Sequence, residues 1–298
     1  MRVTFQAAHR DSLAAINTAS ERLLEFQRQV ATNKRVERPG DDPAAAAAAS
    51  VERTRLAGTD RYTETGNSAQ SRLMVADATL TDLIGQITSA QTTVLAARGT
   101  PVTPQQREAL ALQLESLRDA MLHDLNTQYR GQYLFGGATG TTQPYSKDGA
   151  GVVSSYQASA LEVSVDVDTE HAVAITFNGE ALARGAASDD LFVVMQNAIT
   201  AARAGDEAGL GTALDGLQQA LDRATTFQAR VGSSLRTIED DRVRLAESAR
   251  ASKSRISALE DTNMADAITG MTQAETTYRA ALGAASQMHK LSLMDYLK

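Results

Sequence analysis

Residues 35–50 read RVERPGDDPAAAAAAS, and this stretch decides how the chain divides into helices. Pro39 and Gly40 predict the end of a first helix, since proline lacks an N–H and glycine is conformationally permissive. Asp42 is suited to cap the next helix, Pro43 fits its first position, and the alanines that follow have the highest helix propensity. The stretch therefore predicts a stop and an immediate restart. The turn between the two helical parts consists of Pro39, Gly40, Asp41, Asp42 and Pro43.

Helical periodicity is present on both sides of this turn. Upstream, apolar residues recur at helical spacing from Leu13 to Val30. Downstream, a second helix is expected from Pro43 to about Arg98, which would span roughly 80 Å at the usual rise per residue. The sequence TPQQ at 103–106 predicts a capping box with proline at the first helical position. It opens a third helix, so an antiparallel helical hairpin is expected.

The pattern changes near Gly131, where the chain becomes rich in glycine, threonine and turn formers. Apolar residues then alternate with polar ones over 161–167 and again over 173–177, which is the period of half-buried strands. Residues 168–171 supply a turn between them. We therefore expect a small β-rich insertion built from hairpins.

The most regular pattern runs from Leu210 to Leu259, where alternating steps of four and three residues predict a coiled-coil seam. Gln228, Arg242 and Ser252 interrupt it and are expected to face neighbours in a bundle. After Leu259 the phase slips over residues 260–263, and a separate terminal helix follows. The predicted seam consists of Leu210, Leu214, Leu217, Leu221, Ala224, Gln228, Val231, Leu235, Ile238, Arg242, Leu245, Ala249, Ser252, Ile256 and Leu259.

These patterns predict a mainly α-helical protein with a small β insertion, in which long antiparallel helices from both chain ends form a bundle or coiled coil. Only 4% of the 298 residues are aromatic and none is tryptophan, which favours long helices over a compact core. We expect three parts. The terminal helical part comprises residues 1–42 and 260–298, the long-helix bundle residues 43–137 and 188–259, and an outer β-rich domain residues 138–187.

Composition argues against several classes of function. The formal net charge of −7 disfavours binding to nucleic acid or to anionic membranes. No cysteine is present, and the four histidines do not form a recognised zinc motif, so no metal, cofactor or catalytic residue is expected. No apolar run is long enough to span a membrane, and the N-terminus lacks the apolar stretch of a cleaved signal peptide.

TNKRVERPGDDPAAAAAAS at 32–50 resembles the segment of the flagellin family between its terminal helix and its first long helix. LTDLIGQITSAQTTVLAARG at 80–99, TPQQREALALQLESLRDAM at 103–121 and the C-terminal half extend the resemblance to all but the central β region. It implies a structural protein with a terminal helical layer, a layer of long helices and an outward β domain. It also implies uncleaved export through the flagellar type III apparatus to the extracellular flagellum.

RGQYLFGG at 130–137, TTQPYS at 141–146 and MHKLSLMDYLK at 288–298 are more similar to the branch of the family that joins hook to filament than to filament flagellin. The expected function is therefore a junction adaptor, and a filament subunit remains the alternative. The resemblance implies as partners further copies of the chain in a ring, hook-associated protein 1, flagellin, and an export chaperone on the C-terminal helix.

Residues 1–38 and 264–298 are expected to be largely disordered in the free monomer, because such helices are marginal alone, and to fold when subunits stack. The expected assembly core consists of Leu13, Ile16, Leu23, Val30, Met264, Ile268, Met271, Leu282, Met288 and Leu291. The entry to the β domain consists of Tyr133, Leu134, Phe135, Gly136 and Gly137. The first three are expected to seal the base of the domain, with an exposed partner epitope as the alternative, and the two glycines are expected to be turn residues.

An enzyme that acts on the cell wall is a hypothesis from another class. It would require paired carboxylates or a nucleophile with its base inside the insertion. The insertion contains neither pattern and is small for an active-site cleft. We therefore expect no enzymatic activity.

Overall fold

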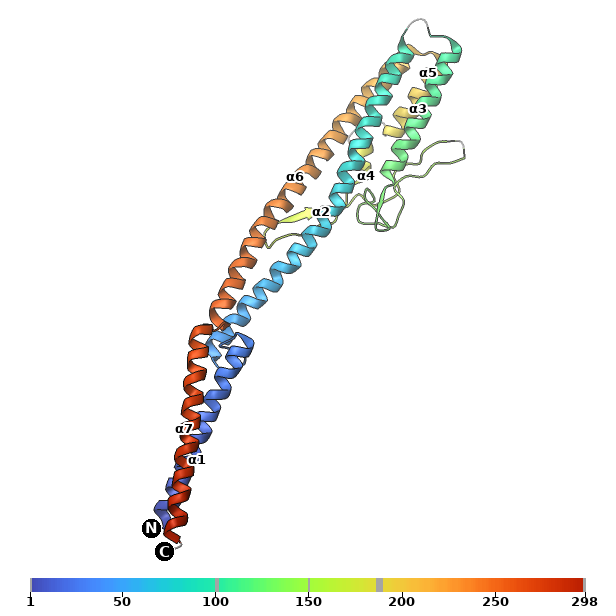
Figure 1. Ribbon diagram of the computed structural model, residues 1–298. Helices are drawn as coiled ribbons and strands as arrows, with labels where there is room; N and C mark the ends of the chain where they lie inside the picture. The colour runs from blue at the N-terminus through green and yellow to red at the C-terminus, as the bar shows by residue number, and fades with distance from the viewer. Residues whose placement is uncertain (1, 100–101, 150, 186–189, 297–298) are drawn as a thin grey trace. The chain divides into compact units, whose positions relative to one another are not determined.

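The structure, a computed structural model, describes residues 2–99, 102–149, 151–185 and 190–296 (Figure 1). It is mainly helical with two small antiparallel sheets, which confirms the expected fold class. The elements are α1 (Arg2–Thr32), α2 (Pro43–Arg98), α3 (Pro104–Leu125), β1 (Gln128–Tyr129), β2 (Gln132–Tyr133), β3 (Ser164–Asp166), β4 (Ala172–Ala174), α4 (Gly179–Ala183), α5 (Leu191–Ala204), α6 (Glu207–Glu260) and α7 (Met264–Tyr296).

The predicted helix starts are confirmed, because both depend on local chemistry. Helix α2 begins at Pro43, and the Ala45 N–H donates to Asp42 Oδ1 over 3.0 Å. Helix α3 begins with a complete capping box, in which Thr103 and Gln106 each accept a hydrogen bond from the other's backbone N–H. These caps satisfy N–H groups that have no partner within a helix.

The prediction that Pro39 and Gly40 end the first helix is wrong. Helix α1 ends at Thr32, and Asn33 adopts a positive φ of 57°. The helix therefore stops through a left-handed residue before the prolines are reached.

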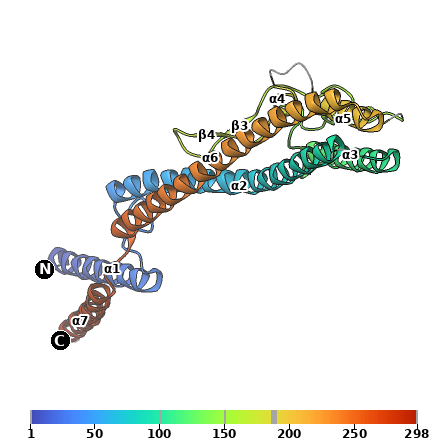
Figure 2. The same cartoon turned by 90° about the horizontal axis from the view of Figure 1, so that it is seen from above.

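The chain divides into two compact units. Unit 1 is formed by the residues up to Gly58 and from Ser248 onward, and unit 2 by Thr59–Glu247. In unit 1, α1 packs along α7. In unit 2, α3 packs along α5, and Figure 2 shows this pair beside the N-terminal part of α6 from a second direction.

Unit 2 has one hydrophobic core with a heptad pattern. On α2, Leu73, Leu80 and Ile87 recur at seven-residue spacing and are fully buried. Leu114 and Met121 of α3 join them from the antiparallel direction, as the expected hairpin requires. The core includes side chains from the non-helical segment, namely Leu134, Phe135, Tyr145, Val167, Val173 and Phe177.

The predicted seam of α6 is half right. Its first set is buried at every seventh residue, as Leu217 and Val231 illustrate. The second set is wrong by one position, because Ala213, Ala220 and Phe227 are buried while the predicted residues Leu214, Leu221 and Gln228 are partly exposed. At two of these three positions the buried side chain is an alanine, and the leucine beside it is partly exposed. The partly exposed seam residues are Leu214, Leu221, Gln228, Leu235, Ala249, Ile256 and Leu259, and Arg242 is exposed.

The polar seam residues have different environments. Ser252 is buried and donates to Glu52 Oε2 over 2.8 Å. Gln228 donates to Thr81 Oγ1 over 2.9 Å. Arg242 instead pairs with Glu239 on its own helix. Two of the three therefore contact a neighbouring helix, as expected for a bundle.

The alternating segment forms the predicted hairpin, with Val165 opposite Val173 in an antiparallel register. A second hairpin pairs Tyr129 with Gln132, and its turn is Arg130-Gly131. The short helix α4, capped by Asn178, was not predicted because one turn of helix leaves no periodicity. The division into three parts with 138–187 outermost concerns position in an assembly, and it stays a prediction.

Candidate assembly site

Two connectors meet in unit 1, one between α1 and α2 and one between α6 and α7. Lys34 forms an isolated antiparallel bridge with Asp261. The Arg35 N–H donates to the Glu260 carbonyl over 2.6 Å, and the Thr262 N–H donates to the Asn33 carbonyl over 3.2 Å. The two polar connectors are therefore bound to each other by backbone hydrogen bonds, and we call the region where they meet the joint.

A buried carboxylate lies at this joint. The Glu260 side chain is only 3% exposed, and its oxygens lie 3.1 Å from Lys34 Nζ and 2.5 Å from an Arg53 nitrogen. The two cations are about half exposed, so their charges stay solvated while they neutralise the buried anion. Arg35 adds a bond to the Leu259 carbonyl over 3.0 Å. We call Lys34, Arg53 and Glu260 the joint clamp.

The predicted turn Pro39, Gly40, Asp41, Asp42 and Pro43 lies next to this clamp. Asp41 Oδ2 accepts the N–H groups of Arg38 and Glu37, and these bonds lower the pKa of Asp41 below its ordinary value of 3.8. The Ala45 N–H, followed by Arg35, lowers the pKa of Asp42 in the same way. The paired aspartates are thus favoured in their charged form, and as carboxylates they stabilise the turn.

The two lowered pKa values predict acid sensitivity of the turn. A carboxyl whose pKa is lower in the folded state stabilises the fold above its unfolded pKa, and this contribution is lost as pH falls through the folded pKa. We expect the turn to loosen below pH 3.8, the ordinary value for both groups. A titration of the side-chain carboxyl carbons by NMR measures this. Midpoints for Asp41 and Asp42 at or above the ordinary value of 3.8 would contradict it.

Small residues bring α1 and α7 together. Ala19 of α1 and Ala267 and Ala274 of α7 are buried at the contact. Gly270 lies against the ring of Phe26, where an added Cβ would be 2.5 Å from a ring carbon. A cavity of about 520 Å³ lies along the same contact. The pair is therefore held by close backbone approach with little apolar burial.

Gly270 and Gly283 on α7 permit a matched test of this contact. Gly270→Ala is expected to cost about 1–3 kcal/mol, because the new methyl group overlaps the Phe26 ring. Gly283 has nothing within 4 Å of an added Cβ, so Gly283→Ala is expected to stabilise the helix by about 0.5–1 kcal/mol. Urea unfolding of the assembled protein, in which α1 and α7 are expected to be ordered, measures both when followed by circular dichroism. Shifts of the same sign would show that Phe26 does not constrain α7.

The residues expected to form the assembly core leave much apolar surface uncovered. Leu13, Met264, Ile268 and Leu282 are 38–47% exposed. Ile16, Leu23, Val30 and Met271 are partly buried. Met288 and Leu291 belong to α7, and their side chains lie outside the described part of the chain. Leu24, which periodicity did not single out, is 59% exposed.

The predicted base of the β domain lies in the core of unit 2. Leu134 and Phe135 are fully buried, Gly136 and Gly137 are buried, and Tyr133 is partly buried. The Phe177 N–H donates to the Leu134 carbonyl over 3.0 Å, which connects this segment to the end of the β3–β4 hairpin.

One cluster resembles a metal site. Single ligand atoms of Asp168, His171 and Asp241 lie within 4.8 Å of one another. Arg244 forms ion pairs with both aspartates and lies 3.0 Å from His171 Nδ1. The Arg244 guanidinium therefore already neutralises these carboxylates. The cluster connects the β3–β4 turn to α6.

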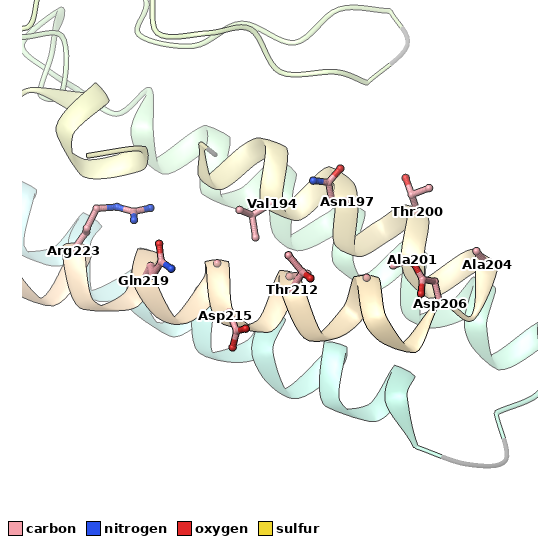
Figure 3. A pocket seen from close by; sticks show the side chains of 13 residues that line it. Val194, Asn197, Thr200, Ala201, Ala204, Asp206, Thr212, Asp215, Gln219 and Arg223 are labelled. Carbon is pink, nitrogen blue, oxygen red and sulfur yellow. The ribbon is translucent and has the colours of Figure 1, made fainter. Parts of the chain in front are cut away.

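A cavity of about 490 Å³ lies between α5 and α6 (Figure 3). Val194, Asn197 and Thr200 line it from α5, and Gln219 and Arg223 line it from α6. Arg223 is engaged by the carbonyls of Leu182 and Ala183. Among the described residues that line this cavity, none is a histidine, cysteine, serine or lysine. Its two threonine hydroxyls, of Thr200 and Thr212, donate to backbone carbonyls of their own helices, so neither is paired with a carboxylate as a base.

Comparison with known proteins gives the following matches. The family model of the bacterial flagellin N-terminal helical region matches residues 4–139, and that of the C-terminal helical region matches residues 214–297. Flagellar hook-associated protein 3 of Escherichia coli (strain K12) is 26% identical over 319 residues, which covers 100% of both chains. The protein of the same name from Salmonella typhimurium (strain LT2) is 23% identical over 318 residues, which covers 99% of both.

Solved structures show the same fold. Bacillus cereus FlgL has a TM-score of 0.60 at 21% identity, covering 70% of this chain and 99% of its own. The flagellar junction protein FlgL from Legionella pneumophila has a TM-score of 0.62 at 13% identity, covering 72% and 100%.

Paired terminal helices joined through polar breaks to longer helices define a flagellin-type helical protein. The chain belongs to the flagellin family. It is a structural component of the bacterial flagellum, and its family is not one of enzymes. Among the described residues, no helix combines the length and apolar character needed to cross a lipid bilayer.

Proposed function

We propose that this chain is the adaptor between the hook and the filament of the flagellum. The observation that carries the proposal is the end-to-end similarity to two proteins named flagellar hook-associated protein 3. The proposed assembly is a ring of copies that contacts hook-associated protein 1 on one side and flagellin on the other. The adaptor would act outside the cell, after uncleaved type III export.

The terminal helices are the proposed contact between copies. Leu13, Ile268 and Leu282 are more than 40% exposed on α1 and α7, and such apolar side chains gain free energy when a neighbour covers them. The contact between α1 and α7 is built from alanine and glycine, so it contributes little hydrophobic stabilisation of its own. We propose that stacking of neighbouring copies completes this helical layer, and that the two helices are largely disordered before assembly.

We also propose that an export chaperone binds residues 264–298 before assembly. An apolar helix that is only marginally stable in the monomer needs cover before export. The chaperone would protect Ile268 and Leu282 and prevent premature association of copies.

The test is electron microscopy of the purified full-length chain added to hook–basal bodies. A short ring that stops growing supports the adaptor, whereas long filaments would identify a filament subunit, which is the alternative. Ile268→Gln and Leu13→Gln are expected to abolish ring formation, because each places an amide in the proposed apolar contact. Thr276→Gln, at an exposed polar position of α7, is the matched control and should assemble normally.

A further inference from the structure

A second cavity, of about 550 Å³, lies in unit 2 beside the β1–β2 hairpin. Residues of α2 form one wall, and residues of the two hairpins form the other. Three arginines and one glutamate are its charged lining residues, although the whole chain has a net charge of −7. The lining residues used below are Arg61, Glu64, Arg72, Tyr129, Arg130 and Gln132.

Arg72 is a buried cation whose hydrogen-bond partners are neutral. Its residue is 6% exposed, and it donates to Gln132 Oε1 over 3.1 Å and to the Tyr133 carbonyl over 3.4 Å. Its Nε has no hydrogen-bond partner. Among the described residues, no carboxylate forms an ion pair with Arg72, and burial lowers its pKa.

Arg118 shows what a fully paired buried arginine looks like in this fold. It is also 6% exposed, but it pairs with Asp119 over 3.1 Å and donates to Gln196 over 2.9 Å. A buried charge without a counterion is unfavourable. Arg72 therefore has unused capacity to bind an anion from outside the chain.

Two further cations lie at the same cavity. Arg61 and Arg130 are both exposed, and among the described residues neither forms an ion pair with a carboxylate. Arg130 lies over the Tyr129 ring, 5.3 Å from its centroid, and has a φ of 52°. Glycine or asparagine would adopt this backbone conformation more easily, so the turn places a guanidinium beside the cavity at a cost in strain.

We propose that this cavity is an oxyanion site that binds a carboxylate or phosphate group between buried Arg72 and exposed Arg61 and Arg130. Guanidinium groups suit this chemistry, because their planar N–H forks match two oxygens of one anion. The volume lies within the range of small-ligand sites and exceeds the size of the anionic group alone. The group is therefore carried either by a small organic or inorganic acid or by an acidic side chain of a second copy of this chain.

The first arm of the test titrates inorganic phosphate and citrate into the full-length chain at fixed ionic strength. Saturable binding is read from the Arg Nε–Hε NMR signals and from calorimetry. Arg61→Gln and Arg130→Gln are each expected to weaken binding about tenfold, since each removes a charge-assisted hydrogen bond. Arg236→Gln, an exposed arginine of α6, makes the same change in charge and should bind as the unmodified chain does.

The second arm measures self-association by analytical ultracentrifugation at low and high salt. If small anions do not bind, and association weakens in salt and in both Arg61→Gln and Arg130→Gln, the anion is an acidic side chain of a second copy. The proposal is overturned if neither arm responds to these substitutions, or if Arg236→Gln has the same effect as they do. Because neither variant alters the terminal helices, ring formation on hook–basal bodies tests the proposed function separately.

Discussion

Replacing Gly137 with alanine is expected to destabilise unit 2 by about 4 kcal/mol or more. Gly137 has a φ of +57°, and an added Cβ would lie 1.9 Å from the Ser159 carbonyl oxygen and 2.7 Å from that of Leu161. Both obstructing atoms belong to the backbone, so no side-chain rotation relieves the overlap. The segment would have to move away from its neighbours, and Gly137 would lose its bond to the Phe177 carbonyl.

Gly131→Ala is the matched control for this prediction. Gly131 also has a positive φ, of +78°, but nothing lies within 4 Å of an added Cβ. Gly131→Ala should destabilise unit 2 by only about 1–2 kcal/mol, because alanine is strained at a positive φ but its methyl group overlaps no neighbour. Urea unfolding of the two variants separates the cost of the positive φ from the cost of the overlap with backbone atoms. A difference of less than about 1 kcal/mol would mean that the segment around Ser159 adapts freely.

The sequence predicts features that depend on neighbours in the chain. Asp42 and Thr103 cap their helices because the residues that they bond lie within one turn. The hairpin with Val165 opposite Val173 follows from alternation and an intervening turn. Features decided by tertiary contacts were not found. Helix α1 stops at Thr32, where the Asn33 carbonyl bonds to Thr262, which is remote in sequence.

For the candidate assembly site, the sequence likewise predicts periodic features and misses those that depend on distant residues. Periodicity singled out apolar residues such as Leu13 and Ile268, because an exposed apolar face and a buried one have the same helical repeat. Their role in an assembly core stays a prediction. Periodicity could not show that Ala220 is buried more deeply than Leu221, since the closest approach of two helices selects for small side chains. The clamp around Glu260 gave no signal, because an isolated charge has no period and its partners are distant in sequence.

The joint clamp predicts an asymmetric response to substitution. Lys34→Met combined with Arg53→Met is expected to destabilise unit 1 by about 3 kcal/mol, because it leaves the Glu260 carboxylate buried without a counterion. Glu260→Gln is expected to cost only about 1 kcal/mol. Its amide keeps part of the hydrogen bonding, and the two exposed cations regain solvent.

The combined triple variant decides whether burial of the charge is the cause. If the cost of the double variant comes from the uncompensated carboxylate, adding Glu260→Gln should recover about 2 kcal/mol of it. If it comes instead from lost packing of the lysine and arginine stems, the third substitution should add to the loss. Denaturant unfolding of the four proteins at neutral pH measures the coupling. Arg250→Met, at an exposed position of α6 in the same unit, controls for the change in surface charge and should be nearly neutral.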